Sequence, residues 1–236
     1  MTERSLIGAR LNEVRTGISQ ACRSAGRAET DITLIVVTKF HPASLVRELY
    51  AHGVRDVGEN RHQEASEKAA QVADLDLRWH FIGQLQSNKA RAVLEYADVI
   101  HSIDRPSLVM ALDRAWHELS ATESARQPIP SFVQINLTDD PNRGGVNESE
   151  LTAFAEHLAS LSSFNVQGVM AVAPLDENPN RAFERVAAAS ELLRKTIPTA
   201  RFMSAGMSHD YAEAIAHGAT HLRIGSAITG NRPPAG

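Results

Sequence analysis

Short apolar runs alternate with segments of helical periodicity along nearly the whole chain. Each apolar run has the length of a buried strand and is bounded by turn residues, which is typical of the strands of a parallel sheet. Eight strands are predicted, at Ile32–Thr38, Asp56–Gly58, Trp79–Gly83, Asp98–Ser102, Ser131–Leu137, Val166–Val172, Arg201–Ala205 and Thr220–Ile224.

A helical segment follows each of the first seven strands, and an amphipathic helix over about residues 3–25 precedes the first strand. Pro42 suits a first helical position, and Ser208 with Asp210 in the next turn suits a helix start. The predicted helices are Pro42–His52, Arg61–Val72, Ser87–Glu95, Arg105–Leu119, Glu148–Leu161, Pro179–Thr196 and Ser208–His217.

Eight strand–helix units predict an α/β protein, a (β/α)8 TIM barrel with an extra N-terminal helix. We expect one domain over residues 1–236, because no linker rich in Pro, Gly or Ser divides the chain. The alternative is an open doubly wound sheet, which usually has a Gly-rich turn after its first strand. Here Thr38-Lys39-Phe40-His41-Pro42 follows that strand, and no G-x-G-x-x-G or P-loop pattern occurs.

Composition narrows the classes of function. The 236 residues are 43% hydrophobic with a net charge of −4, which argues against binding to nucleic acid or to an anionic membrane. No apolar run is long enough to span a bilayer, the N-terminus is charged, and Cys22 is the one cysteine, so we expect a cytoplasmic protein. The ten histidines lack metal-binding spacings, so no metal site is predicted.

The candidate chemistry lies where the strands end, since a barrel carries its function at the carboxyl ends of its strands. The loops after strands seven and eight, Ser204–Ser208 and Gly225–Ala227, are rich in Gly and Ser. Barrels often bind phosphate at these two loops through backbone N–H groups. The alternative is that both are only tight turns, which favour the same residues.

Lys39 directly follows the first strand, where a partly desolvated amine can attack an aldehyde. A surface charge is the alternative. The other three lysines, Lys68, Lys89 and Lys195, fall in predicted helices and are interpreted as solvated. Arg223 interrupts the last apolar strand, so it needs a partner: either the ring nitrogen of a cofactor or a salt bridge to a neighbouring strand. An amine beside a phosphate cradle suits pyridoxal 5′-phosphate (PLP).

At these same residues the chain resembles the pyridoxal phosphate homeostasis proteins. The resemblance runs from about residue 30 to residue 230, and the His80-to-Lys89 block is its most specific part. The matching stretches are Val37-Thr38-Lys39, Gly58-Glu59-Asn60, Trp79 to Lys89, Ser102-Ile103-Asp104, Gln134-Ile135-Asn136, Gly168 to Ala171, Ser204 to Ser208 and Arg223 to Ile228.

The resemblance implies a barrel like the N-terminal domain of alanine racemase, with PLP held as a Schiff base on Lys39. It implies that Asn60, Ile82 and Met170 line the ring and that Arg223 faces the ring nitrogen. It also implies that Ser204, Gly225 and Ser226 hold the phosphate, with Met207 and Ser208 close by. Thr38, Phe40-His41, Ser226 and Thr229 depart from the commonest family pattern, and the effect of Thr229 on pocket closure stays open.

The family is thought to buffer or deliver PLP and to affect the balance of amino and keto acids, with no established turnover. We therefore expect no catalytic residue, and apo-enzymes that depend on PLP as partners of a monomeric chain. A racemase-like PLP enzyme is the alternative, but its second acid/base has no counterpart, because Tyr50, Tyr96 and Tyr211 all fall in predicted helices. A third hypothesis is a barrel that binds a phosphorylated metabolite without a Schiff base.

Overall fold

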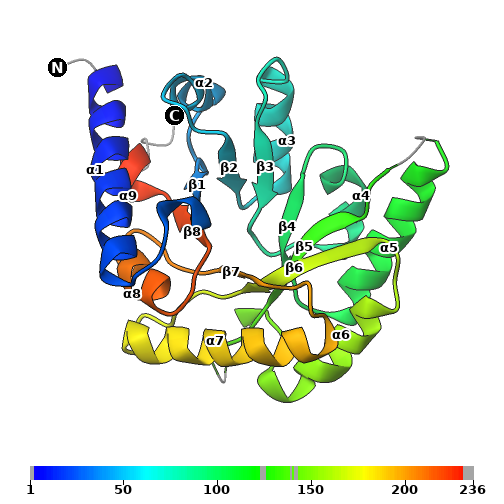
Figure 1. Ribbon diagram of the computed structural model, residues 1–236. Helices are drawn as coiled ribbons and strands as arrows, with labels where there is room; N and C mark the ends of the chain where they lie inside the picture. Colours follow the sequence, from blue (N-terminus) through cyan, green and yellow to red (C-terminus); the bar gives the residue numbers. More distant parts are fainter. Residues whose placement is uncertain (1–2, 123–125, 139, 141–142, 231–236) are drawn as a thin grey trace.

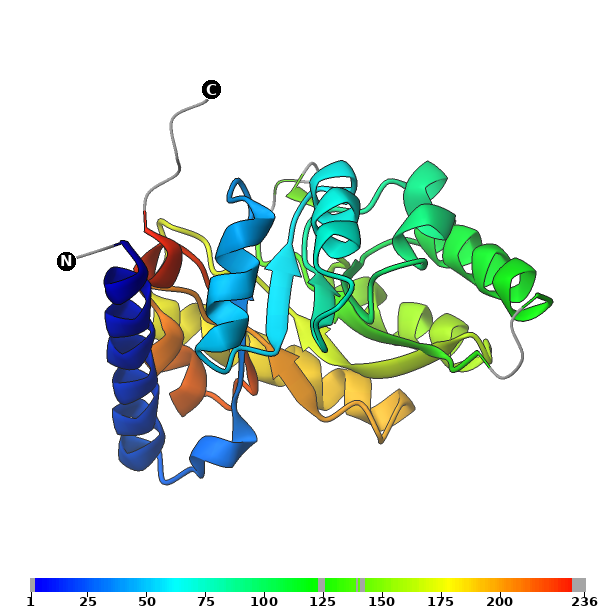
Figure 2. The ribbon, with the colours of Figure 1, turned by 90° about the horizontal axis from the view of Figure 1, so that it is seen from above.

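The computed structural model describes residues 3–122, 126–138, 140 and 143–230. Its strands form one closed parallel barrel in the order of the chain, β1 to β8, with helices around the outside (Figures 1 and 2). The strands are β1 (Thr33–Val37), β2 (Asp56–Glu59), β3 (Arg78–Phe81), β4 (Val99–Ile103), β5 (Ile129–Gln134), β6 (Phe164–Met170), β7 (Phe202–Ser204) and β8 (His221–Ile224). The predicted (β/α)8 barrel is confirmed, and the open sheet is excluded.

The helices follow the predicted order. They are α1 (Glu3–Ser24), α2 (Ala43–Ala51), α3 (His62–Gln71), α4 (Ala90–Val93), α5 (Pro106–Ser120), α6 (Leu151–Ala159), α7 (Pro179–Thr196), α8 (Tyr211–Ala216) and α9 (Ser226–Thr229), with short 3-10 turns η1 (Glu29–Asp31), η2 (Ser87–Lys89) and η4 (Glu148–Glu150). The four-residue α9 was not predicted, because one helical turn is too short to show periodicity.

Several helix starts differ from the sequence prediction. Pro42 is the N-cap of α2 and not its first helical residue. The segments predicted as single helices from Ser87 and Glu148 each divide into a 3-10 turn and an α-helix, η2 with α4 and η4 with α6. The last predicted helix begins at Tyr211, so the expectation that Ser208 caps it is wrong. The reason is local: the backbone N–H of Met207 donates to Asp210 Oδ1 at 2.5 Å, and this bond closes a turn ahead of the helix.

The additional helix α1 covers the place where the barrel closes. Ile7, Leu11, Val14, Ile18 and Cys22 recur three or four residues apart and are all buried, as expected for one apolar helix face. This face packs against α8 and α9, and Figure 1 shows α1 beside both. The helix therefore supports the loops that follow β7 and β8.

Parallel pairing sets the relative heights of the strand ends. β1 pairs with β8 from Thr33 opposite His221 to Val36 opposite Ile224, which closes the barrel. At β6, Gly168 lies opposite Phe202, where a Cβ atom would collide with the backbone carbonyl of Phe202. A glycine is required there for β6 and β7 to pair.

The barrel interior is partly polar, and two of its buried histidines are neutral at ordinary pH. His101 and His221 are buried beside Phe132, whose ring stacks on His101 at 4.5 Å between centroids. Burial lowers the pKa of His221 to about 4 and the pKa of His101 well below its ordinary value. The uncharged rings therefore pack as part of the core at neutral pH.

We predict an acid-labile contribution from His221. In the unfolded chain its pKa is about 6.5, while in the fold it is about 4. Between these values the unfolded state binds the extra proton, so the free energy of unfolding falls as the pH falls, by up to about 1.4 kcal/mol per pH unit. Urea titrations at about pH 7 and pH 4.5 should show a smaller loss for His221→Gln than for the parent chain. Equal losses would contradict the assignment.

Candidate functional site

All ten residues predicted to bind the cofactor lie at one end of the barrel. Each is at or just after the carboxyl end of a strand, or is the last-but-one residue of β8 in the case of Arg223. They are Lys39 after β1, Asn60 after β2, Ile82 after β3, Met170 at the end of β6, Ser204 at the end of β7, Met207 and Ser208 in the next loop, Arg223 in β8, and Gly225 and Ser226 after it.

The loops after β7 and β8 lie against each other. The backbone N–H of Arg223 donates to the carbonyl of Gly206 at 3.0 Å, and the N–H of Ala227 lies 3.4 Å from Ser208 Oγ. Gly206 has a φ of 93°, a conformation that L side chains rarely adopt. A Cβ atom on Gly225 would lie 3.5 Å from Cβ of Val37, so this loop also adjoins the end of β1. The two loops and the Lys39 segment thus form one continuous rim.

Lys39 is exposed, and its Nζ lies 5.9 Å from the centroid of the Phe40 ring. Phe40 is the one described non-glycine residue with a positive φ, 68°. Such a conformation is costly for a large side chain and persists only when its surroundings hold it. The backbone N–H of Phe40 donates to Glu64 Oε1, which supplies part of that support.

A buried ammonium group holds the segment before Lys39. Lys68 Nζ donates to three oxygens, each at 2.7 Å: the carbonyl of Thr38, Glu59 Oε1 and Glu64 Oε1. The hydroxyl of Thr38 also donates to Glu59 Oε1, at 2.6 Å. Burial raises the pKa of Glu59, and the bonds from Lys68 and Thr38 oppose that rise.

The interpretation of Lys68 as a solvated helix residue is therefore wrong, since it is only 5% exposed. The sequence does contain a signal, the i,i+4 spacing of Glu64 and Lys68. The sequence does not reveal that this face of α3 packs toward the strand ends, where Glu59 provides Lys68 with a second carboxylate. Lys195 is exposed as predicted.

Arg223 is 4% exposed, and its guanidinium bonds to backbone and hydroxyl oxygens. NH1 donates to the carbonyl of Ser204 at 2.6 Å and to Ser204 Oγ at 2.7 Å, and NH2 donates to the carbonyl of Ala171 at 2.7 Å. No carboxylate of the described residues forms a salt bridge with it, so the salt-bridge alternative fails. Burial lowers the pKa of Arg223 to about 10, which leaves it cationic at neutral pH.

Asn60 and Ile82 come from the neighbouring strand ends β2 and β3. Asn60 Oδ1 is buried and has no hydrogen-bond partner among the described residues. A Cβ on Gly83 would collide with the backbone carbonyl of Asn60, so these two loops are packed tightly together. An unpartnered buried amide oxygen at a strand end is a group that a bound ligand can satisfy.

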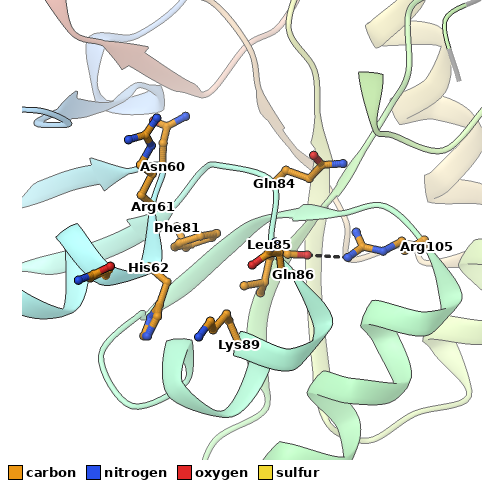
Figure 3. A pocket seen from close by; sticks show the side chains of 10 residues that line it. Asn60, Arg61, His62, Phe81, Gln84, Leu85, Gln86, Lys89 and Arg105 are labelled. Atoms are coloured by element: carbon orange, nitrogen blue, oxygen red, sulfur yellow. Dashed lines mark hydrogen bonds between the residues drawn. The ribbon is translucent and has the colours of Figure 1, made fainter. Parts of the chain in front are cut away.

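An open basin of about 800 Å³ adjoins this rim on the side of β2, β3 and β4 (Figure 3). Its cationic lining residues are Arg61, Lys89 and Arg105, and no carboxylate of the described residues lines it. Arg105 is partly neutralised, because NH1 donates to Asp104 Oδ1 at 2.5 Å while NH2 donates to the carbonyl of Leu85. Figure 3 shows the amine end of Lys89 pointing toward His62. We call this basin, with its cationic lining residues Arg61, Lys89 and Arg105, the cationic basin.

Each of the three tyrosines contacts a partner of its own. Tyr50 is in α2, with its ring 3.8 Å below the guanidinium of Arg55, and the hydroxyl of Tyr96 lies 3.4 Å from His62 Nδ1. Tyr211 opens α8, and its hydroxyl lies against Gly17 of α1.

None of the described helices is long and apolar enough to cross a membrane.

Comparisons with known proteins agree with this geometry. The family described as "Alanine racemase, N-terminal domain" matches residues 8–233. A pyridoxal phosphate homeostasis protein of Mycobacterium leprae is 39% identical over 232 residues, 93% of this chain and 90% of its own length. One from Escherichia coli K12 is 38% identical over 233 residues, 96% of this chain and 97% of its own length.

Solved structures give the same picture. PipY of Synechococcus elongatus, solved with PLP bound, superposes with a TM-score of 0.82 at 35% identity, covering 94% of this chain and 99% of that one. Alanine racemase of Corynebacterium glutamicum superposes with a TM-score of 0.71 at 18% identity, over 99% of this chain and 62% of that one, a likeness in fold alone. The chain belongs to the pyridoxal phosphate homeostasis protein family, within the alanine racemase N-terminal domain fold.

Proposed function

We propose that this protein binds PLP at the mouth of the barrel as a Schiff base on Lys39 and serves intracellular PLP homeostasis. In this role it buffers the cofactor and delivers it to apo-enzymes, and so affects the balance of amino and keto acids. The observation that carries the proposal is the position of Lys39, which extends from a buried, ion-paired segment onto the same rim as the Gly225 loop. The PLP-bound structure of PipY at 35% identity supports it.

The residues present fit the group. Asn60 Oδ1 offers a buried acceptor without a partner, and Met170 supplies a buried apolar surface beside Ser204. Three of the five N–H donors of a guanidinium are used by Arg223 in the fold, which leaves two for a ligand. The loops at Met207-Ser208 and Gly225-Ser226 offer backbone N–H groups and hydroxyls for a phosphate.

Ser204 calls for a different role from the one that the family resemblance implies. Its hydroxyl bonds to Arg223 at 2.7 Å and lies 2.9 Å from His101 Nδ1, so it is occupied within the protein. We infer that the phosphate is held by Ser208, Gly225 and Ser226, and that Ser204 contributes by holding Arg223.

PLP supplies an aldehyde that condenses with an amine when it is bound. The chain contributes the amine of Lys39, which lies beside the ring of Phe40. Arg223 remains a donor at neutral pH, so a ring nitrogen bonded to it stays unprotonated, which weakens the cofactor as an electron sink. Such an arrangement favours holding the cofactor over carbanion chemistry.

A racemase-like function has less support. Two-base racemisation requires a second acid/base opposite the lysine. The hydroxyls of Tyr96 and Tyr211 lie against His62 and Gly17. No observation in the described part of the chain favours this second function.

Lys39→Ala is the direct test of the proposed attachment. The parent chain, incubated with PLP and freed of excess cofactor, should be yellow and should bleach with borohydride. Lys39→Ala should remain colourless under both conditions, as read by its absorption spectrum. Lys195→Ala, which removes an exposed lysine of α7, is the matched control and should behave as the parent. A yellow, reducible Lys39→Ala protein would reject the proposal, and a colourless parent that binds PLP reversibly would favour the hypothesis without a Schiff base.

Lys68→Met tests the support beneath Lys39. Removing the ammonium leaves Glu59 buried without its cation, so we expect the free energy of unfolding to fall by about 3 kcal/mol or more. The same variant should bind PLP more weakly, because the Thr38–Phe40 segment is released. The double variant Glu59→Gln/Lys68→Met should recover part of the stability, since no buried charge is then unpaired. Denaturant titration and PLP titration measure the two effects, and unchanged PLP affinity in a folded Lys68→Met protein would refute the supporting role.

Delivery to apo-enzymes gives the cationic basin a function. Arg61 and Lys89 are exposed beside the rim, so an acidic surface around the active site of a recipient apo-enzyme can dock there by charge complementarity. This step accounts for a strongly cationic surface on a chain of net charge −4.

Charge reversal tests that docking. In Arg61→Glu/Lys89→Glu, the rate of PLP transfer to an apo-aminotransferase should fall on the order of tenfold at low salt, relative to the rate of release into buffer. Arg114→Glu/Lys195→Glu, which reverses two exposed charges on α5 and α7, is the control. Equal transfer rates for the two double variants would mean that the cofactor passes through solution instead.

A further inference from the structure

A chain of hydrogen bonds crosses the barrel from one end to the other. At the mouth, Arg223 NH1 donates to Ser204 Oγ at 2.7 Å, and this oxygen lies 2.9 Å from His101 Nδ1. His101 Nε2 lies 2.9 Å from His80 Nδ1, and His80 Nε2 lies 2.9 Å from Asp56 Oδ1. Asp56 is the first residue of β2, so the chain ends on a carboxylate at the opposite rim.

The two ends of this chain fix the direction of its hydrogen bonds. A guanidinium only donates and a carboxylate only accepts. The hydroxyl of Ser204 offers one donor and two acceptor lone pairs, and a neutral histidine offers one donor and one acceptor. Every group is satisfied when Ser204 donates to His101 Nδ1, His101 Nε2–H donates to His80 Nδ1, and His80 Nε2–H donates to Asp56. In the reverse direction the hydroxyl hydrogen of Ser204 has no acceptor, because Arg223 is a donor. Both histidines are therefore Nε2–H tautomers.

The surroundings keep these groups in line. Ser204 and His101 are fully buried, and His80 is 1% exposed. His101 stacks on Phe132 at 4.5 Å and meets His80 edge-on at 5.1 Å, so both rings are packed against neighbours. Burial lowers the pKa of His101 well below its ordinary value, which keeps that ring neutral.

The hydrogen-bond chain also links the guanidinium of Arg223 to a carboxylate, in addition to the through-space attraction of Asp210. The guanidinium bonds directly to two carbonyls and one hydroxyl, with no carboxylate in the described part of the structure at ion-pair distance. The nearest compensation through bonds is the carboxylate of Asp56, four hydrogen bonds away. A polarised hydrogen-bond chain of this kind fixes the orientation of the Ser204 hydroxyl and of the planar guanidinium of Arg223.

We propose that Asp56, His80 and His101 are positioning residues, which fix the tautomers of the chain and so present the two remaining N–H groups of Arg223 to a ligand in the barrel mouth. The identity of this ligand as the ring nitrogen of PLP rests on the proposed function above. The direction of the hydrogen bonds is independent of that function, because it follows from the protein groups alone.

The first experiment uses the PLP-free chain labelled with ¹⁵N-histidine. Long-range ¹H–¹⁵N correlation spectra at neutral pH should show His80 and His101 as neutral Nε2–H tautomers. In Asp56→Asn the carboxamide can donate or accept, so the direction is no longer fixed and both tautomers of His80 should be populated. Asp76→Asn removes an exposed carboxylate from the same rim and should leave the spectra as in the parent. A parent chain with Nδ1–H tautomers would overturn the proposal.

The second experiment reads the cofactor end. Asp56→Asn, which lies at the far rim from the cofactor site, should shift the absorption maximum of the PLP-loaded protein and weaken PLP binding about threefold to tenfold. Asp76→Asn should do neither. A changed tautomer with an unchanged spectrum and affinity would overturn the positioning role.

A buried pair of variants separates positioning from packing. His101→Phe breaks the hydrogen-bond chain, whereas His221→Phe removes another buried ring, which contacts Phe132 and lies 2.9 Å from the hydroxyl of Thr220. Both should lose stability, but only His101→Phe should change the spectrum of the loaded protein. Matching spectra for the two would assign His101 to the core alone. If PLP binds without Lys39, the proposed attachment fails. The tautomers of His80 and His101 still test the direction of the hydrogen-bond chain.

Discussion

The parallel pairing of β1 with β8 is the constraint on which the rest of the structure depends. It sets Val36 opposite Ile224, so that the residues immediately beyond both strands share one rim. Lys39 then lies next to the Gly225 loop, which packs against Val37: a Cβ atom on residue 225 would be 3.5 Å from Cβ of Val37. In an open sheet β1 and β8 would be separated, and an amine and a phosphate cradle on those strands would never meet.

Two buried cations fix the positions of the residues at this rim. Lys68 binds three oxygens beneath the Lys39 segment, and Arg223 binds three oxygens at the ends of β6 and β7. Burying a charge is costly unless it is fully hydrogen-bonded, so each cation fixes the position of the strands that surround it. The first holds the backbone on which the reactive amine stands, and the second holds a donor toward the mouth. Both act through contacts that link residues far apart in the sequence.

Much of the fold could be predicted from the sequence, because the strands and helices each keep one period over several residues. The eight strands and the exact limits of α7 followed from that pattern. The four-residue α9 and the burial of Lys68 did not, since a single turn has no period and since the orientation of α3 depends on how the barrel closes. The Asp56-to-Arg223 chain also escaped prediction. His101 and Ser204 are 103 residues apart, and only the strand registers bring their side chains together.

The strand ends predicted where the site lies, and the family resemblance implied which residues there bind the cofactor. Their individual roles need the structure: the hydroxyl of Ser204 is directed at Arg223 and His101, which no local pattern indicates. The most direct measurement of the central claim is peptide mapping of the borohydride-reduced, PLP-loaded protein by mass spectrometry. The account predicts the pyridoxyl phosphate group on the peptide that contains Lys39. A label on Lys68, Lys89 or Lys195, or no covalent label at all, would contradict it.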